Sequence, residues 1–113
     1  MLKISGTKIT INRGDTAFLT ITVRDREGNV YELQDGDSLW FSVKQKATDE
    51  NYAIAPKKLN KNVLEIMRED TINLDFGSYI YDIQLVNNQG FTSTIIQPSE
   101  FNVAVTVTAA GDR

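Results

Sequence analysis

Apolar and polar residues alternate over residues 78–107, as they do in strands that bury one face and expose the other. Residues 78–86 and 91–96 are two such predicted strands, and residues 100–107 are a third. The inward positions of the first and third strands are Tyr79, Tyr81, Ile83, Leu85, Phe101, Val103, Val105 and Val107. Short polar turns join the three segments, so the pattern predicts an antiparallel meander. We therefore expect an all-β protein.

The N-terminal half repeats this alternation in shorter segments. We predict strands at residues 8–12, 16–24, 30–33, 38–44 and 63–67, and a short edge strand at residues 52–55 that ends at Pro56. The inward positions of the two clearest segments are Ala17, Leu19, Ile21, Val23, Leu39, Phe41 and Val43. Turn residues recur about every ten positions, so we expect a sandwich of about seven to nine strands.

One stretch departs from the strand pattern. Residues 68–77 favour a single helical turn that Asp70 or Thr71 caps, with Leu74 and Phe76 closing one end of the core. Residues 1–108 are expected to form a single β-sandwich domain. Residues 109–113 lack a core pattern, and we predict that they form a flexible C-terminal tail.

Composition limits the chemistry that the chain can perform. Its 113 residues include no cysteine and no histidine, which removes disulfides, thiolate metal sites, the Ser-His-Asp triad and the usual general base. We therefore expect no enzymatic activity, no cofactor and no metal. The net charge of -3 argues against a nucleic-acid partner. No apolar run approaches a membrane span and residues 1–6 lack a signal region, so we expect the protein to stay initially in the cytoplasm.

Two turn motifs have both a functional and a structural interpretation. Arg13-Gly14-Asp15 matches the integrin-binding tripeptide, but a Gly-Asp pair after a strand is ordinary turn chemistry, and we favour the turn. Asp35-Gly36-Asp37, together with Asp25 and Glu27, offers oxygen ligands for calcium. Their spacing does not match the twelve-residue calcium loop, so we expect these aspartates to cap backbone amides.

Trp40 and Phe18 are the predicted interface residues. Trp40 stands on the opposite strand face from Leu39 and Phe41, and Phe18 stands among threonines. If both face outward on one sheet, they form an apolar patch of the kind that binds partners. The alternative is that a loop or residues 74–76 cover them.

The order of turns and strands is more specific than any single motif. Arg13-Gly14-Asp15-Thr16, an Asp-x-x-Gly turn at residues 25–28, Asp35-Gly36-Asp37 and Asp70-Thr71 precede the string Gly77-Ser78-Tyr79-Ile80-Tyr81-Asp82-Ile83-Gln84. Over residues 2–108 this arrangement resembles small phage and prophage structural proteins. It is similar to the N-terminal domain of the upper baseplate protein of lactococcal siphophages.

The resemblance implies an immunoglobulin-like antiparallel β-sandwich without enzymatic activity. It also implies a virion component of the tail or baseplate, assembled in the host cytoplasm, whose partners are other phage structural proteins or further copies of itself. Two other classes stay open. A carbohydrate-binding module would stack exposed aromatic rings on sugars, and a cell-surface adhesin module would need a signal peptide and a sorting tail.

Overall fold

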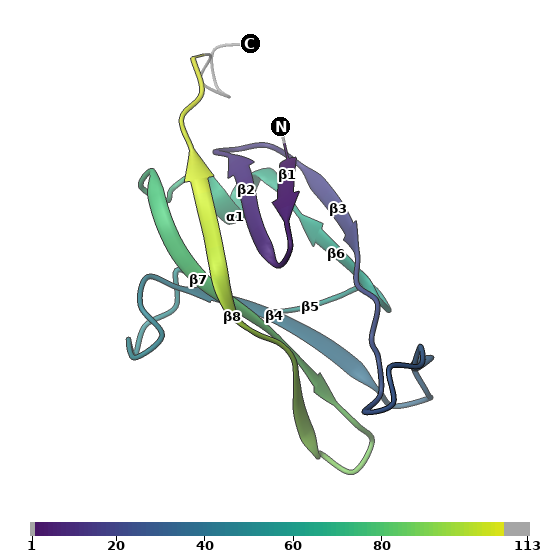
Figure 1. The fold of residues 1–113 in the computed structure, drawn as a ribbon. Helices are drawn as coiled ribbons and strands as arrows, with labels where there is room; N and C mark the ends of the chain where they lie inside the picture. Colours follow the sequence, from purple (N-terminus) through teal and green to yellow (C-terminus); the bar gives the residue numbers. More distant parts are fainter. Residues whose placement is uncertain (1, 108–113) are drawn as a thin grey trace.

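The computed structural model describes residues 2–107, and side chains from residue 6 onward. These residues form eight β-strands and one helical turn (Figure 1). The elements are β1 Leu2–Ser5, β2 Lys8–Asn12, β3 Ala17–Thr20, β4 Ser38–Lys44, β5 Ile54–Lys58, β6 Val63–Ile66, α1 Arg68–Thr71, β7 Gly77–Val86 and β8 Thr92–Ala104. The expectation of a mostly β protein is confirmed. The described part of the chain has no helix that is long and apolar enough to cross a membrane.

The strands form two sheets of unequal size. The larger sheet has six strands in the order β1-β2-β8-β7-β4-β5, and the smaller sheet pairs β3 with β6. Adjacent strands are antiparallel except for β2 and β8, which run parallel with Ile9 opposite Phe101. The prediction of a wholly antiparallel architecture is therefore wrong at this pairing. A parallel pair needs a long connection, and here all the strands from β3 to β7 lie between its members, so no local pattern indicates it.

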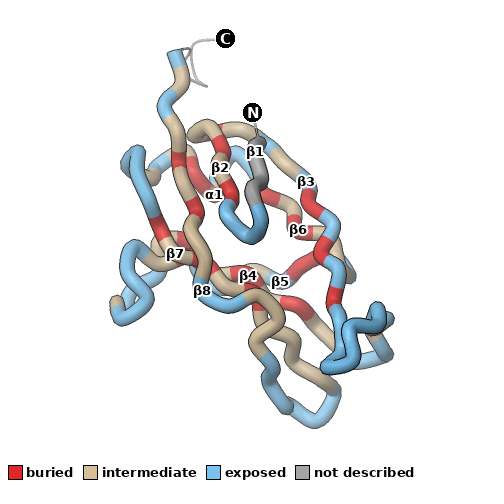
Figure 2. The backbone as a smooth tube through the Cα atoms, viewed as in Figure 1, coloured by how far each residue is buried: buried red, intermediate tan, exposed pale blue. Residues whose placement is uncertain are grey.

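Both sheets turn one face toward a shared apolar core (Figure 2). The buried apolar residues are Ile9, Ile11, Leu19, Ile21, Val23, Leu39, Phe41, Val43, Ile54, Leu59, Leu64, Ile66, Tyr79, Tyr81, Ile83, Phe101 and Val103. Among them, the rings of Phe41, Tyr81 and Phe101 contact one another, with centroids 5.7, 5.8 and 6.3 Å apart. The inward positions predicted within residues 38–44 and 79–83 are confirmed.

Two tyrosines place their rings in the core and their hydroxyl groups at its edge. The Tyr79 hydroxyl donates to the Asp75 carbonyl at 2.8 Å, and the Tyr81 hydroxyl donates to the Thr7 carbonyl. A buried hydroxyl needs such a partner, because an unsatisfied polar group in the core is costly. Burial raises the pKa of Tyr81 to about 12.

β8 is one long strand where the sequence predicts two. The expected turn at residues 97–99 is wrong, because the chain passes through Pro98 and stays paired with β7. Pairing runs from Tyr81 opposite Ser99 to Ile83 opposite Ile96, so β8 holds one extra residue there. Proline lacks a backbone N–H and is tolerated at such a bulge, where the ladder is already interrupted.

The alternation at the end of β8 continues past the sheet. Val105 and Val107 are 65% and 104% exposed, so their predicted inward position is wrong. The physical reason is the length of the neighbouring strand: β2 ends at Asn12, which lies opposite Ala104. The predicted tail, residues 109–113, lies outside the described residues.

Three predicted strands differ in extent, and one strand was not predicted. β3 covers only part of residues 16–24, and residues 30–33 make a single bridge between Val30 and Arg24. The edge strand β5 begins two residues later than expected and includes Pro56, as an edge position allows. β1 has no counterpart among the predicted strands.

The single helical turn is confirmed, and an ion pair links it to β5. Asp70 Oδ2 accepts a hydrogen bond from the Met67 backbone N–H at 2.8 Å and pairs with Lys57 Nζ at 2.6 Å. Thr71 is fully buried instead of capping the turn. Leu74 packs against the core, whereas Phe76 is 43% exposed and does not close it as predicted.

Candidate functional site

The structure places the predicted interface residues on different sheets. Phe18 lies on β3 in the smaller sheet and is 63% exposed, whereas Trp40 lies on β4 in the larger sheet and is half-buried. Because the inner faces of both sheets pack into one core, the two outward-facing side chains point away from each other. The condition for one joint patch, that both residues lie on one sheet, is therefore not met, since strand alternation gives a side chain's face but not its sheet. An interface role for either residue stays a prediction.

Trp40 is held against the outer face of its sheet. Its indole Nε1 donates to Ser38 Oγ at 2.9 Å, and its neighbours across the ladder are Gln84 and Lys58. The planar row of exposed aromatic rings expected of a carbohydrate-binding module therefore does not form from Trp40 and Phe18.

The Arg13-Gly14-Asp15 turn packs against the segment that includes α1. Gly14 is buried, and its N–H donates to Thr71 Oγ1 at 2.8 Å. The Arg13 guanidinium carbon lies 4.2 Å from the centroid of the Phe76 ring. The interpretation of this tripeptide as a structural turn is confirmed.

The aspartates considered for calcium binding order the loop between β3 and β4. Asp25 Oδ1 accepts from the backbone N–H groups of Glu27 and Asn29 at 2.9 and 3.0 Å. Asp37 Oδ2 accepts from the Gln34 N–H at 2.9 Å. The predicted capping role is confirmed for Asp25 and Asp37. Within the described residues, no three His, Cys, Asp or Glu side chains gather in a way that could hold a metal ion.

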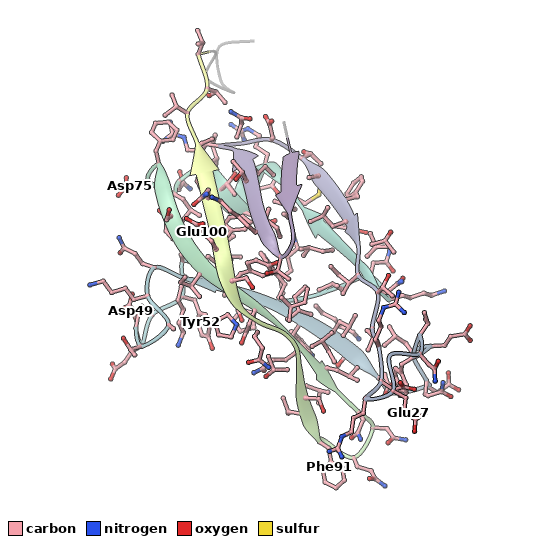
Figure 3. All side chains as sticks on the ribbon, in the orientation of Figure 1. Glu27, Asp49, Tyr52, Asp75, Phe91 and Glu100 are labelled. Carbon is pink, nitrogen blue, oxygen red and sulfur yellow. The ribbon has the colours of Figure 1, made fainter. Side chains whose placement is uncertain are left out.

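Two loops meet at one end of the molecule, which we call the loop end. They are residues 24–37, between β3 and β4, and residues 87–91, between β7 and β8; Figure 3 marks them with Glu27 and Phe91. At Gly36 the loops are so close that an added Cβ atom would lie 2.5 Å from the Asn88 Cβ. Gly36 also has a φ of 86°, a left-handed conformation that favours glycine. Direct contact therefore fixes one loop against the other.

Side-chain hydrogen bonds stabilise both loops of the loop end. Asn87 Oδ1 accepts from the backbone N–H groups of Gln89 and Phe91 at 2.9 and 3.0 Å. In the other loop, the Tyr31 hydroxyl donates to Asp37 Oδ2 at 2.6 Å. That bond is the main reason why the pKa of Asp37 is lowered and the pKa of Tyr31 is raised. Loops that are ordered in advance lose little conformational freedom when a partner binds.

The loop end exposes two large apolar side chains. Phe91 is 67% exposed beside the hairpin turn, and Val30 is 59% exposed in the other loop. Sequence reasoning missed both, because it assigned them to half-buried strands. The signal available for Phe91 was its position directly after Gly90, where a turn ends and pairing has not yet begun.

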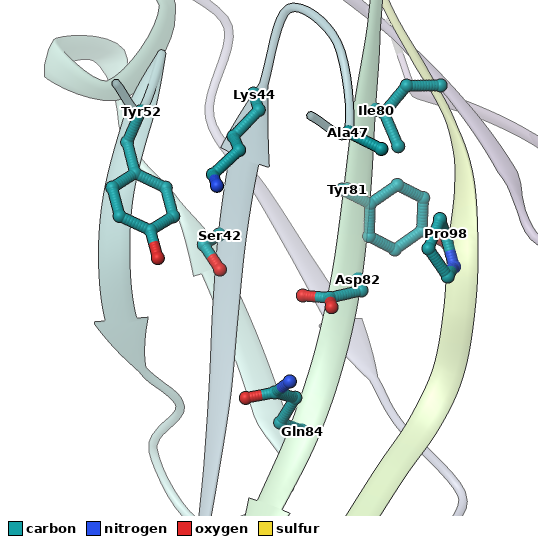
Figure 4. Close-up of a pocket in the computed structure, with 9 residues that line it drawn as sticks. All are labelled: Ser42, Lys44, Ala47, Tyr52, Ile80, Tyr81, Asp82, Gln84 and Pro98. Carbon is teal, nitrogen blue, oxygen red and sulfur yellow. The ribbon is translucent and has the colours of Figure 1, made fainter. Parts of the chain in front are cut away.

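A second surface feature is a hollow of about 220 Å³ on the outer face of the larger sheet, which we call the outer hollow (Figure 4). Its floor consists of Ser42 from β4 and of Asp82 and Gln84 from β7, and Ser42 lies directly opposite Asp82 in the ladder. The Asp82 carboxylate turns toward β4 (Figure 4). Partial burial raises the pKa of Asp82, against the smaller opposing effects of the Lys44 charge and of a hydrogen bond with Ser42.

Apolar side chains stand at both sides of the outer hollow, although its lining is polar overall. Tyr52 stands on the β5 side and is 48% exposed, and Ile80 and Pro98 stand on the β8 side (Figure 4). Lys44 Nζ lies 4.8 Å from the centroid of the Tyr52 ring, a cation–π contact that holds the ring beside the floor. Sequence reasoning missed this feature, because it depends on the register of three strands.

No protein-family model matches the chain, and no curated protein matches it significantly. Functional conclusions therefore depend on the fold and on these surfaces.

Proposed function

We propose that this protein is a non-catalytic structural component of a phage or prophage tail or baseplate. It acts through protein–protein contacts in virion assembly, in the host cytoplasm, and remains in the virion. Its partners are other tail proteins or further copies of itself. The turn and strand order that resembles small phage structural proteins supports this proposal, and so does a composition without histidine or cysteine.

The strand order supports an immunoglobulin-like sandwich as the finer description of the fold. In that fold, strands B and E are neighbours in one sheet and strands C, F and G follow one another in the other sheet. Here β3 and β6 are neighbours, as B and E would be, and β4, β7 and β8 are adjacent in the order of C, F and G. β5 then occupies the position of the extra strand C′ of variable-type domains.

The tyrosine at the start of β7 gives independent support to the same fold. Immunoglobulin-like domains have a tyrosine near the start of strand F whose hydroxyl bonds to the backbone a few residues upstream. Tyr79 has this geometry, because its hydroxyl donates to the carbonyl of Asp75, four residues earlier. Two features differ from antibody domains: Phe41, and not a tryptophan, is the buried aromatic residue of β4, and the chain has no cysteine for the disulfide between strands B and F.

The observation that carries the functional proposal is the ordered, partly apolar loop end. In immunoglobulin variable domains, the B–C and F–G loops at one end of the sandwich bind the partner. Residues 24–37 and 87–91 occupy the corresponding positions, stabilised by mutual contact and by side-chain caps. Exposed Phe91 fits the role of a binding anchor, because aromatic side chains add large contact areas at little entropic cost.

The charge around this anchor indicates the chemistry of the partner surface. Residues 24–37 contain five acidic and two basic side chains. A partner that accepts the Phe91 ring in an apolar pocket would therefore carry basic side chains at the rim of that pocket, since complementary charge favours association.

Purification of particles tests the proposed function directly. Prophages are induced in the strain that carries the coding sequence, particles are banded on a density gradient, and each fraction is quantified by peptide mass spectrometry. We expect this protein to follow the tail proteins at a constant ratio through the gradient. Its recovery only in fractions without particles, although tail proteins band normally, would overturn the proposal.

A further inference from the structure

We propose that the outer hollow binds a single neutral sugar ring. This site is separate from the loop end, and the inference does not depend on a role in the virion. It rests on the size of the hollow, on the arrangement of polar and apolar groups around it, and on the balance of its charges.

The size of the outer hollow suits one ring and not a longer ligand. Its volume is about 220 Å³. Pockets for drug-sized ligands measure about 300–1,000 Å³, so this hollow holds a smaller molecule.

The polar floor and apolar sides match the two kinds of surface on a sugar ring. A pyranose presents hydroxyl groups at its edge and C–H groups on its two faces. Standing on edge, the ring would direct hydroxyls to Ser42, Asp82 and Gln84, and one of its faces would contact Ile80. Its other face would contact Tyr52 once the Lys44 ammonium, which lies 4.8 Å from the centroid of the Tyr52 ring, turns toward a ring hydroxyl. Small-ligand sites combine apolar side chains with placed polar groups that fix the orientation of the ligand, and here the polar groups predominate.

Asp82 is suited to accept hydroxyl hydrogens. Its carboxylate is partly removed from water, and burial is the first cause of its raised pKa. A carboxylate that has lost part of its hydration gains more from a ligand hydroxyl than a fully hydrated one, because less water is displaced. Gln84 offers both a donor and an acceptor beside it, and the Ser42 oxygen, whose hydrogen is donated to Asp82, can still accept.

The balance of charges favours a neutral ligand over an ion. One cation, Lys44, and one anion, Asp82, line the hollow, and their charges interact. An ammonium ligand would be attracted by Asp82 but repelled by Lys44, and a phosphate or sulfate would meet the reverse, so neither ion gains a net attraction from the two charges. A neutral ring with several hydroxyl groups can pair with both.

An NMR titration of the ¹⁵N-labelled full chain tests the inference. The probes are methyl glycosides of glucose, galactose, mannose and rhamnose and of N-acetylglucosamine, with ethylammonium and inorganic phosphate as charged competitors. We expect at least one glycoside to shift the amide signals of Ser42, Asp82 and Gln84 saturably, with a dissociation constant on the order of millimolar for so small a ligand. Signals of the loop end should stay in place.

Matched variants distinguish specific binding in the outer hollow from non-specific contact with the protein surface. Tyr52→Ala removes one apolar side, and Gln84→Ala removes one floor group, and each should weaken binding by about fivefold or more. Phe18→Ala, on the smaller sheet, should leave binding unchanged. The inference is overturned if ethylammonium or phosphate alone shifts these signals, or if both hollow variants bind like the parent chain. It is also overturned if no glycoside shifts them at about 50 mM, which is 50-fold above the expected dissociation constant of about 1 mM. None of these results bears on whether the protein is found in particles.

Discussion

The core and the loop end of this protein are ordered by different interactions. In the core, the rings of Phe41, Tyr81 and Phe101 are shielded from water and contact one another. At the loop end, every residue from 24 to 30 is exposed, and order comes from side-chain caps and from the contact of Gly36 with Asn88. The core therefore determines stability, and the loop end has the fixed shape that its proposed role in binding a partner requires.

The largest expected effect is in the core. Phe101→Ala removes a fully buried ring from between Phe41 and Tyr81, and it should lower the free energy of unfolding by about 3–5 kcal/mol. That is a large fraction of the 5–15 kcal/mol typical of a domain. Urea denaturation followed by circular dichroism measures it. Phe91→Ala is the matched control and should change stability by less than about 0.5 kcal/mol; similar losses in both variants would contradict the comparison.

Alkaline pH should also lower the free energy of unfolding, through the core residue Tyr81. Burial holds the pKa of Tyr81 at about 12 in the folded state, above the ordinary value of about 10. The folded state therefore keeps a proton that the unfolded chain releases, so this contribution to stability is full below pH 10 and is lost as pH rises toward 12. We expect the free energy of unfolding to fall over that interval.

Tyr81→Phe sharpens the alkaline test. The variant loses the hydrogen bond to the Thr7 carbonyl and should be less stable at pH 8 by about 1 kcal/mol. Without a titrating hydroxyl at this position, its stability should fall less steeply between pH 10 and pH 12. Parallel curves for the two proteins would show that Tyr81 is not responsible.

Where the two loops touch, the expected loss of stability is smaller than that of Phe101→Ala. Gly36→Ala forces a left-handed alanine and brings its Cβ to 2.5 Å from the Asn88 Cβ, so it should destabilise by about 1–3 kcal/mol. Gly28→Ala is the matched control, because Gly28 has a φ of 85° but no atom within 4 Å of the added Cβ. Thermal melts of the two variants separate the clash from the backbone strain. Equal losses would mean that contact with Asn88 does not hold the loops together.

Local alternation was sufficient to predict the elements that pair with near neighbours. The strand predicted at residues 38–44 is observed as β4, with Leu39, Phe41 and Val43 buried as expected. Local alternation does not predict where a strand turns or ends when contacts with distant segments decide this. Pro98 signals a turn in isolation, yet a bulge accommodates it within β8. Val107 continues the inward pattern, but it lies beyond the last pairing of β8 with β2, at Ala104, and is fully exposed.

The candidate sites show the same limit. Periodicity placed Phe18 and Trp40 outward, but the distribution of strands between two sheets separates them. The outer hollow brings together Tyr52 and Asp82, which are far apart in the sequence, through the pairing of β4 with β7. The loop end depends on the close approach of Gly36 to Asn88. Such contacts between distant segments carry no local signature.

The most direct test of the central claim is the incorporation of point variants into particles. Parent chain, Phe91→Ala and Phe18→Ala are each supplied to a prophage that lacks the gene, and the protein content of gradient-purified particles is measured by mass spectrometry. We expect at least a tenfold reduction for Phe91→Ala, with an unchanged melting temperature, and near-parental content for Phe18→Ala. Normal incorporation of Phe91→Ala, or a loss confined to Phe18→Ala, would contradict the assignment of the loop end as the assembly surface.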